Sequence, residues 1–136
     1  MGNELNGDDR TGVAVAESLQ TRLNDPRYLV INGGNAPENY LGKIIKFGAN
    51  IVLIIDAADL GKTPGSIELI QWSDTQGLSA STHSLPPSVM AKYLVAELGC
   101  EVLLLAVQAG SLNLMQPLTP PVARAVEDII ETISKI

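Results

Sequence analysis

The stretch Ile51-Val52-Leu53-Ile54-Ile55-Asp56-Ala57-Ala58-Asp59 decides the fold class. Its first five residues are all aliphatic and mostly β-branched, which is typical of a strand buried on both faces. Such strands occur in α/β proteins, where helices cover both sides of a parallel sheet. Asp56 follows at once, and a carboxylate in that position is costly unless it is paired, hydrogen-bonded or bound to a metal. This stretch therefore predicts a buried strand that ends in a polar group.

The segments on either side of this strand alternate between helical and extended patterns. Apolar residues at helical spacing predict helices over residues 9–23, 37–47 and 86–98, and from residue 120 onward. Short β-branched or alternating runs predict strands over 28–31, 51–55, 66–72 and 101–107. The order predicts a single domain, residues 1–136, with a three-layer α/β architecture: a mainly parallel sheet and helices on both faces.

Composition narrows the class of function. The chain has 136 residues, 46% of them hydrophobic, and a formal net charge of −6. That charge, with no basic cluster to offset it, argues against nucleic acid and anionic membranes as partners. The single cysteine, Cys100, excludes an internal disulfide, and there is no signal-peptide pattern and no apolar run long enough to span a bilayer. We expect a soluble, cytoplasmic protein.

Three polar residues stand where apolar or glycine-rich runs end: Asp9, Asp56 and His83, the only histidine. In open α/β sheets, ligands bind outside the carboxyl ends of the strands. Two carboxylates and one imidazole gathered there would form a metal site with nitrogen and oxygen ligands and open positions. Each residue also has an ordinary interpretation. Asp8 or Asp9 is suited to cap the first helix, His83 to anchor a loop, and Asp56 to meet a buried partner.

Other common catalytic patterns are absent. The chain has no Gly-x-Ser-x-Gly elbow, no His-Glu-x-x-His helix and no phosphate-binding loop. A serine triad built on His83 and Asp56 stays open, although no serine lies in a recognisable elbow. Asp59 belongs to a turn-like segment and is expected to fix that turn.

Four motifs occur in order along the chain: residues 2–9 (Gly-Asn-Glu-Leu-Asn-Gly-Asp-Asp), 32–39 (Asn-Gly-Gly-Asn-Ala-Pro-Glu-Asn), 55–59 (Ile-Asp-Ala-Ala-Asp) and 82–84 (Thr-His-Ser). Together they resemble the maturation endopeptidases of nickel–iron hydrogenases. Within these, the series is similar to the branch that processes the large subunit of formate-hydrogenlyase-type enzymes. The resemblance covers essentially the whole chain, including the region of Gln108 and residues 116–119 ahead of the last helix.

The resemblance implies an endopeptidase that removes a short C-terminal extension from a hydrogenase large-subunit precursor. The nickel already bound in that precursor is the recognition signal, so nickel is supplied by the substrate and no separate cofactor is expected. The family's catalytic and metal-contacting positions fall on Asp9, Asp56 and His83. Which of the three activates water is not decided, and the loop over 33–39 is expected to help shape the cleft.

Two other functional classes remain open. A non-catalytic, chaperone-like module would use the same three residues to hold or sense a divalent metal. In a purely structural interpretation, a buried partner neutralises Asp56, and His83 only anchors its loop. Incubation with a nickel-loaded precursor separates these classes, because only a protease shortens it.

The chain departs from the family pattern in two places. Arg10 stands where family members usually have glycine, which costs stability only if that position needs a positive φ. The family also begins with a buried strand ahead of the Gly2-Asn3 turn, and we expect this strand near the centre of the sheet, between the strands around Val30 and Val52. If it is absent, the 136-residue chain is expected to form a homo-oligomer or to be poorly stable, because unpaired strand edges are costly.

Overall fold

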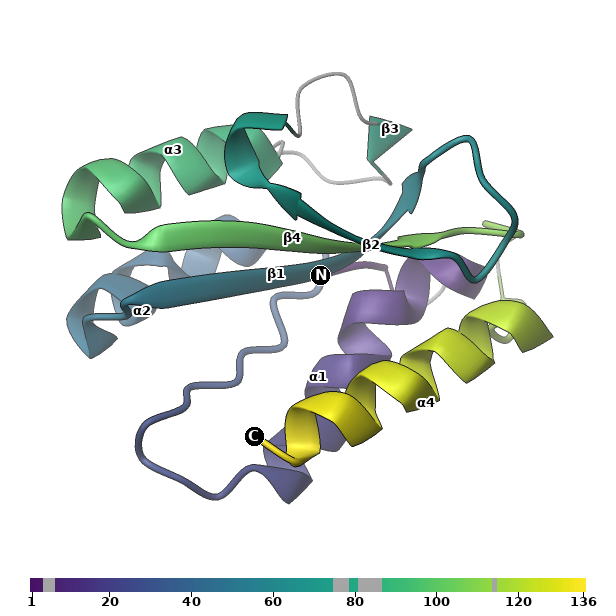
Figure 1. The fold of residues 1–136 in the computed structure, drawn as a ribbon, viewed down its shortest axis with the longest axis horizontal. Coiled ribbons are helices and arrows are strands. Elements are labelled where there is room, and N and C mark those ends of the chain that lie inside the picture. The colour runs from purple at the N-terminus through teal and green to yellow at the C-terminus, as the bar shows by residue number, and fades with distance from the viewer. Residues whose placement is uncertain (4–6, 75–78, 81–86, 114) are drawn as a thin grey trace.

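A mixed sheet between two layers of helices forms the fold (Figure 1). The structure is a computed structural model that describes residues 1–3, 7–74, 79–80, 87–113 and 115–136. Within these residues the sheet has the strand order β2-β4-β1-β3. The strands are β1 (Ile51–Asp59), β2 (Ile67–Gln71), β3 (Ser79–Ala80) and β4 (Glu101–Gln108). The helices are α1 (Thr11–Arg22), α2 (Leu41–Phe47), α3 (Pro87–Leu98) and α4 (Pro120–Ser134), with 3₁₀ turns η1 (Gly7–Arg10), η2 (Pro37–Tyr40) and η3 (Trp72–Asp74).

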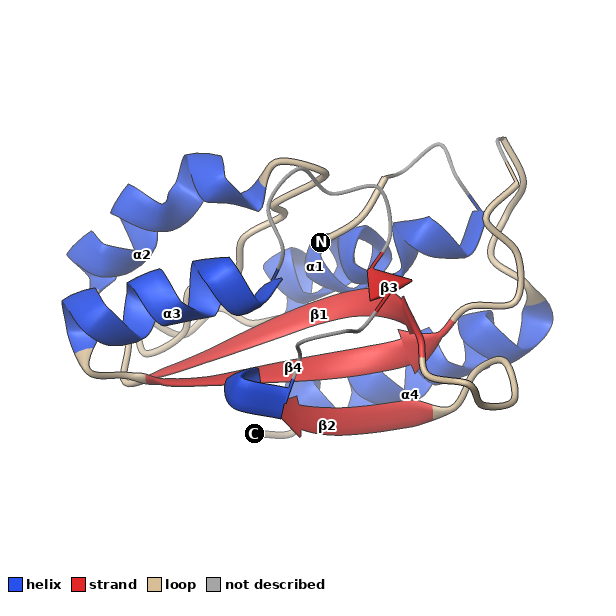
Figure 2. Cartoon of the chain, turned by 90° about the horizontal axis from the view of Figure 1, so that it is seen from above, coloured by secondary structure: helices blue, strands red, loops and turns tan. Residues whose placement is uncertain are grey.

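Each face of the sheet carries its own apolar core, which confirms the predicted three layers. Helices α1 and α4 lie together against one face, and α2 and α3 lie on the other (Figures 1 and 2). The first core contains Val15, Leu19, Val107, Val122, Val126, Ile129 and Ile130. The second contains Ile54, Ala58, Met90, Leu94, Val102 and Leu104, with Leu41, Ile44 and Ile45 packed against it.

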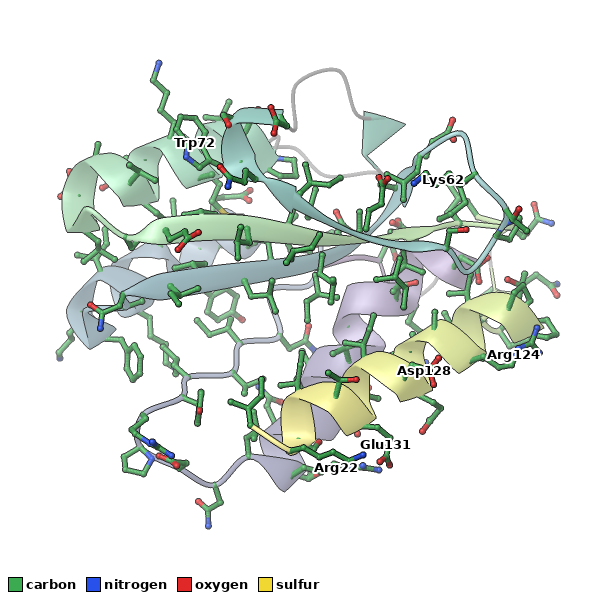
Figure 3. All side chains as sticks on the ribbon, in the orientation of Figure 1. Arg22, Lys62, Trp72, Arg124, Asp128 and Glu131 are labelled. Carbon is green, nitrogen blue, oxygen red and sulfur yellow. The ribbon has the colours of Figure 1, made fainter. Side chains whose placement is uncertain are left out.

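The predicted helices are present close to their expected bounds. Gly48 ends α2 in a left-handed conformation, with φ 73°, and its amide donates to the carbonyls of Ile44 and Ile45. Pro120 begins α4, as the fixed φ of proline favours. Arg22 of α1 and Glu131 of α4 form an exposed ion pair at 3.7 Å (Figure 3). Because both side chains are exposed, this pair adds little to stability, and apolar packing holds the two helices together.

The expectation of a mainly parallel sheet is wrong. Strands β1 and β4 are parallel, from the pair Ile51 and Glu101 to the pair Ala58 and Gln108. In the described chain, however, β2 pairs with β4 and β3 pairs with β1 in antiparallel fashion. A parallel neighbour needs a crossover of about a dozen residues or more. Only the short segment 60–66 separates β1 from β2, so β2 starts at the end of the sheet where β1 finishes and runs back.

The strand predicted over residues 28–31 is also not formed. These residues are described and belong to no strand of the sheet. The carbonyl of Val30 accepts a hydrogen bond from the Gln20 side chain at 3.3 Å instead. The β-branched pattern is real, but a strand needs a hydrogen-bonded neighbour, and none of the described strands lies against this segment.

Strand β1 is buried less evenly than its sequence predicts. Ile51 is 62% exposed and Leu53 is 40% exposed, whereas Ile54, Asp56 and Ala57 are buried. On the side away from β4, β1 pairs only with β3, at Ala58 and Asp59; within the described residues the rest of that edge meets no strand. The first half of β1 therefore carries exposed apolar side chains along an open edge.

No helix among the described residues is long and apolar enough to cross a membrane.

Candidate functional site

Asp56 lies inside β1, three residues before its end, and not after it as predicted. It pairs with Ala106 of β4 and is 1% exposed. Because side chains alternate along a strand, Asp56 shares the face of Ile54 and Ala58, which α2 and α3 cover. The sheet thus places one ionisable side chain in an apolar layer, in the carboxyl half of two parallel strands.

Asp9 lies in the 3₁₀ turn η1 and is fully buried. The prediction that Asp8 or Asp9 caps the first helix is wrong. Helix α1 begins at Thr11 with Arg10 as its N-cap, and no side-chain capping bond is formed there. The extra turn moves the helix start past both aspartates, so their carboxylates have other neighbours. The Asp9 carbonyl accepts a hydrogen bond from the Asn3 amide at 3.0 Å.

The N-terminal ammonium group of Met1 lies next to both predicted carboxylates. It donates to the Ile55 carbonyl at 2.6 Å, and Figure 1 shows the N-terminus beside β1. Burial lowers the pKa of this amine below its ordinary 8.0, while the negative charges of Asp56 and Asp9 act in the opposite direction. Two carboxylates from different elements therefore act on one buried amine.

Glycines permit the close approach that builds this region. A Cβ on Gly12 of α1 would lie 2.2 Å from the Ile55 carbonyl oxygen and 2.2 Å from both backbone N and O of Met1. Gly2 has φ +148°, and a Cβ there would lie 1.9 Å from the Asp9 carbonyl oxygen. Only glycine at these two positions lets the chain start pass between α1 and β1.

His83 falls in residues 81–86, which lie outside the described structure. The described chain comes back to the sheet just ahead of it, because Ala80 of β3 pairs with Ala58, two residues beyond Asp56 in β1. Among the described residues, no three His, Cys, Asp or Glu side chains form a group suited to a metal. The role of His83 as a third ligand stays a prediction.

The turn after β1 is organised as its sequence predicts. The Asp59 carboxylate accepts a hydrogen bond from the Gly61 amide at 3.1 Å. Gln108, at the end of β4, accepts from the amides of Leu60 at 2.5 Å and Lys62 at 3.3 Å. These contacts hold the 60–62 turn beside the carboxyl ends of both parallel strands.

The structure also shows the conformation of Arg10 and a contact of the loop over 33–39. Arg10 has φ −80° and ψ −4°, a right-handed helical conformation, so this position needs no glycine. The carbonyl of Gly34, in the predicted cleft loop over 33–39, accepts from the Gly2 amide at 2.8 Å. That loop therefore supports the turn that carries Asn3, and its part in shaping a cleft stays a prediction.

Sequence reasoning treated Asp8 only as a possible helix cap and missed the role of its carboxylate, which is fully buried. Its carboxylate accepts hydrogen bonds from Gly110, Ser111 and Thr119, on the connection between β4 and α4. The only local signal was a second acidic residue beside Asp9, and its partners lie more than a hundred residues away.

The family model described as HycI, hydrogenase maturation protease, matches residues 13–136. The chain belongs to the hydrogenase maturation protease family. The hydrogenase 3 maturation protease of Escherichia coli strain K12 is 32% identical over 134 residues, which cover 98% of this chain and 85% of that protein.

Solved structures of hydrogenase maturation proteases have the same fold. The nickel–iron hydrogenase maturation protease HycI from Thermococcus kodakarensis KOD1 superposes with a TM-score of 0.90 at 34% identity, covering 98% of this chain and 86% of that one. The solution structure of the endopeptidase HycI from Escherichia coli gives 0.87 at 31% identity, with 98% and 85% covered. These likenesses confirm the family resemblance drawn from the motifs.

Proposed function

We propose that this hydrogenase maturation protease removes the C-terminal extension from a nickel-loaded hydrogenase large-subunit precursor, and that it recognises the bound nickel through Asp9, Asp56 and His83. Family membership supports the class of reaction. The observation that carries the site is the pair of buried carboxylates, from η1 and β1, whose charges act on one buried amine.

The cost of burying these groups supports a cation-binding role. A buried carboxylate is costly without a compensating partner, and two carboxylates that lie near the same group repel each other. A positive charge near both carboxylates would offset these costs, and both carboxylates already act on the Met1 amine. Carboxylate oxygens and an imidazole nitrogen suit a divalent transition metal. The same neighbourhood would therefore favour a metal ion carried by the substrate.

In the proposed reaction the substrate's nickel positions the peptide bond, and a side chain of the protein accepts a proton. The precursor's nickel anchors the scissile peptide, and such positioning can supply on the order of 7–11 kcal/mol of the barrier. A water oxygen then adds to the scissile carbonyl carbon, the carbon–nitrogen bond breaks, and the leaving nitrogen takes up a proton. One of the three side chains accepts the proton of the attacking water, and the assignment among them stays open.

The test is a cleavage assay with a hydrogenase large-subunit precursor prepared with and without nickel. Wild type should shorten only the nickel-loaded form. Asp56→Asn removes the charge at nearly constant size, and His83→Ala removes the imidazole; each should lower the cleavage rate by about 10²–10⁴-fold, the usual contribution of a positioned acid or base. Both variants should fold, with free energies of unfolding close to wild type.

Asp59→Asn is the matched control. It alters a carboxylate in the same strand, three residues on, and keeps the oxygen that accepts from Gly61. This variant should cleave normally. Normal cleavage by Asp56→Asn or His83→Ala would overturn the assigned roles. A wild type that binds the nickel-loaded precursor without shortening it would favour the chaperone-like alternative.

A further inference from the structure

The Asp8 carboxylate is the centre of a buried clamp between two distant segments. Its Oδ2 accepts from the amides of Gly110 at 2.7 Å and Ser111 at 2.9 Å and from the Thr119 hydroxyl at 2.7 Å. Its Oδ1 accepts from the Thr119 amide at 2.7 Å. Hydrogen bonds to an ionised acceptor are roughly twice as strong as neutral ones. Both ends of the connection between β4 and α4 are therefore fastened to one side chain.

The backbone around the carboxylate is shaped to the same contact. The Asp8 amide donates a hydrogen bond to the Ser111 carbonyl at 2.8 Å, and the Ser111 amide donates one to the Asp8 carboxylate. The two residues are therefore joined in both directions. Gly7 has φ +52°, and a Cβ on it would lie 2.8 Å from that carbonyl oxygen. A Cβ on Gly110 would lie 3.2 Å from Asp8 Oδ2. A larger side chain at Gly7 would separate the two segments, and one at Gly110 would press directly on the Asp8 carboxylate.

The clamp also fixes the residue beside it. The Asp8 carbonyl accepts from the Thr11 hydroxyl at 2.6 Å, so the amide, carboxylate and carbonyl of Asp8 are all held. The next peptide unit leads directly to Asp9, whose own carbonyl accepts from the Asn3 amide at 3.0 Å. Because a peptide unit is planar, holding both sides of Asp9 fixes the position of its Cα and the direction of its Cα–Cβ bond.

We propose that Asp8 is a positioning residue for the cleavage reaction: it locks the η1 turn to the connection between β4 and α4 so that Asp9 meets the nickel of the substrate at a fixed position. This proposal rests on the proposed function of Asp9. A displacement of about 1 Å in a catalytic group can cost about 10²-fold in rate, so a loosened clamp should lower kcat in a protein that is still folded.

Two variants loosen the clamp by different amounts. Asp8→Asn removes the charge and turns an NH₂ group toward at least one donor. Thr119→Val removes only the hydroxyl and keeps the Thr119 amide, whereas Thr119→Ser keeps both donors. Thr132→Val is the matched control: it deletes an exposed threonine hydroxyl of α4 that donates to the Asp128 carbonyl at 2.7 Å.

The closing experiment measures kcat and KM for nickel-loaded precursor well below each variant's unfolding midpoint, together with urea unfolding. We expect Thr119→Val to lower kcat about tenfold and Asp8→Asn about 10²-fold, with KM nearly constant. Thr119→Ser and Thr132→Val should match wild type. If Asp8→Asn does not fold, Thr119→Val carries the test. A wild-type kcat in folded Thr119→Val, or in folded Asp8→Asn, would reduce the clamp to a structural role.

A second readout separates this proposal from the proposed function. Amide hydrogen exchange at Gly110, Ser111 and Thr119, and the backbone resonances of Asp9, are followed by NMR in Thr119→Val. Faster exchange together with a shifted Asp9 resonance supports the clamp, even if wild type fails to shorten the precursor and the cleavage role is lost. Exchange rates and an Asp9 resonance equal to wild type overturn the clamp, whatever the activity.

Discussion

Replacing Gly12 by alanine tests the close contact between α1 and β1 beside the two buried carboxylates. The new Cβ would lie 2.2 Å from three atoms, the Ile55 carbonyl oxygen and the N and O of Met1, where ordinary contacts are 3.4–4 Å. All three are backbone atoms, so no side-chain rotation relieves the overlap. Either α1 moves away from the sheet or the first residues of the chain leave their place.

The helix preference of alanine stabilises the Gly12→Ala variant, whereas the steric overlap destabilises it, and the overlap is the larger effect. Alanine is favoured over glycine in a helix by about 1 kcal/mol. Overpacking costs about 1–3 kcal/mol, and three backbone overlaps put this case near the upper value. Displacing Met1 also breaks the hydrogen bond from its amine to the Ile55 carbonyl, and a hydrogen bond contributes about 0.5–1.5 kcal/mol. The balance is a loss of about 2.5–3.5 kcal/mol, a large part of the roughly 5–15 kcal/mol that holds a domain together.

The assay is equilibrium urea unfolding, with Gly42→Ala as the control. Gly42 lies in α2, is exposed, and a Cβ on it would meet nothing within 4 Å. The same chemical change there should raise the free energy of unfolding by about 0.5–1 kcal/mol, because only the helix preference remains. If Gly12→Ala is as stable as wild type while Gly42→Ala behaves as expected, the tight packing of α1 on β1 is refuted.

Two further predictions concern the open edge of β1 and the family departure at Arg10. The exposed side chain of Leu53 on that edge favours pairing with a second copy, so Leu53→Lys should lower the average mass in light scattering; an unchanged mass would exclude this edge as the contact. Because Arg10 is already helical and its guanidinium lies 3.3 Å from the Glu17 carboxylate, Arg10→Gly should lower the free energy of unfolding by about 1 kcal/mol; a more stable variant in thermal melting would contradict the helical assignment.

The elements that the sequence predicts well are those whose signals are local. Apolar residues at helical spacing report which face of a helix is buried, and this pattern placed all four α-helices of the described chain. Gly48 and Pro120 marked boundaries because their backbone preferences act on their own residues. The family motifs likewise depend on short spacings, and the comparisons confirm the family that they indicated.

The failures concern partners that are distant in sequence. Residues 28–31 have the composition of a strand, but pairing requires a neighbour that local composition does not specify. The direction of β2 depends on the length of its connection and on which edge of β4 is free. The even burial expected of β1 failed at Ile51 and Leu53, because burial depends on where the helices of the other layer cross the sheet. Propensity measures what a segment can form, and tertiary contacts decide what it does form.

Asp8 and Asp9 show that local sequence also fails to specify the long-range partners of residues in the candidate site. They are identical residues, adjacent in one turn and both fully buried, so their local pattern gives no reason to assign them different roles, and only the family resemblance placed the site at Asp9. Their surroundings supply the difference. Asp8 is surrounded by neutral donors that hold it in place, a use of a carboxylate that needs no further ligand. The negative charges of Asp9 and Asp56 both act on the buried amine of Met1. The roles that we propose for the two adjacent aspartates differ because different long-range partners reach each carboxylate. Substituting them one at a time separates these roles. Thr119→Ser should preserve the function of Asp8, whereas no change in the clamp should restore cleavage to a chain that lacks the Asp9 carboxylate.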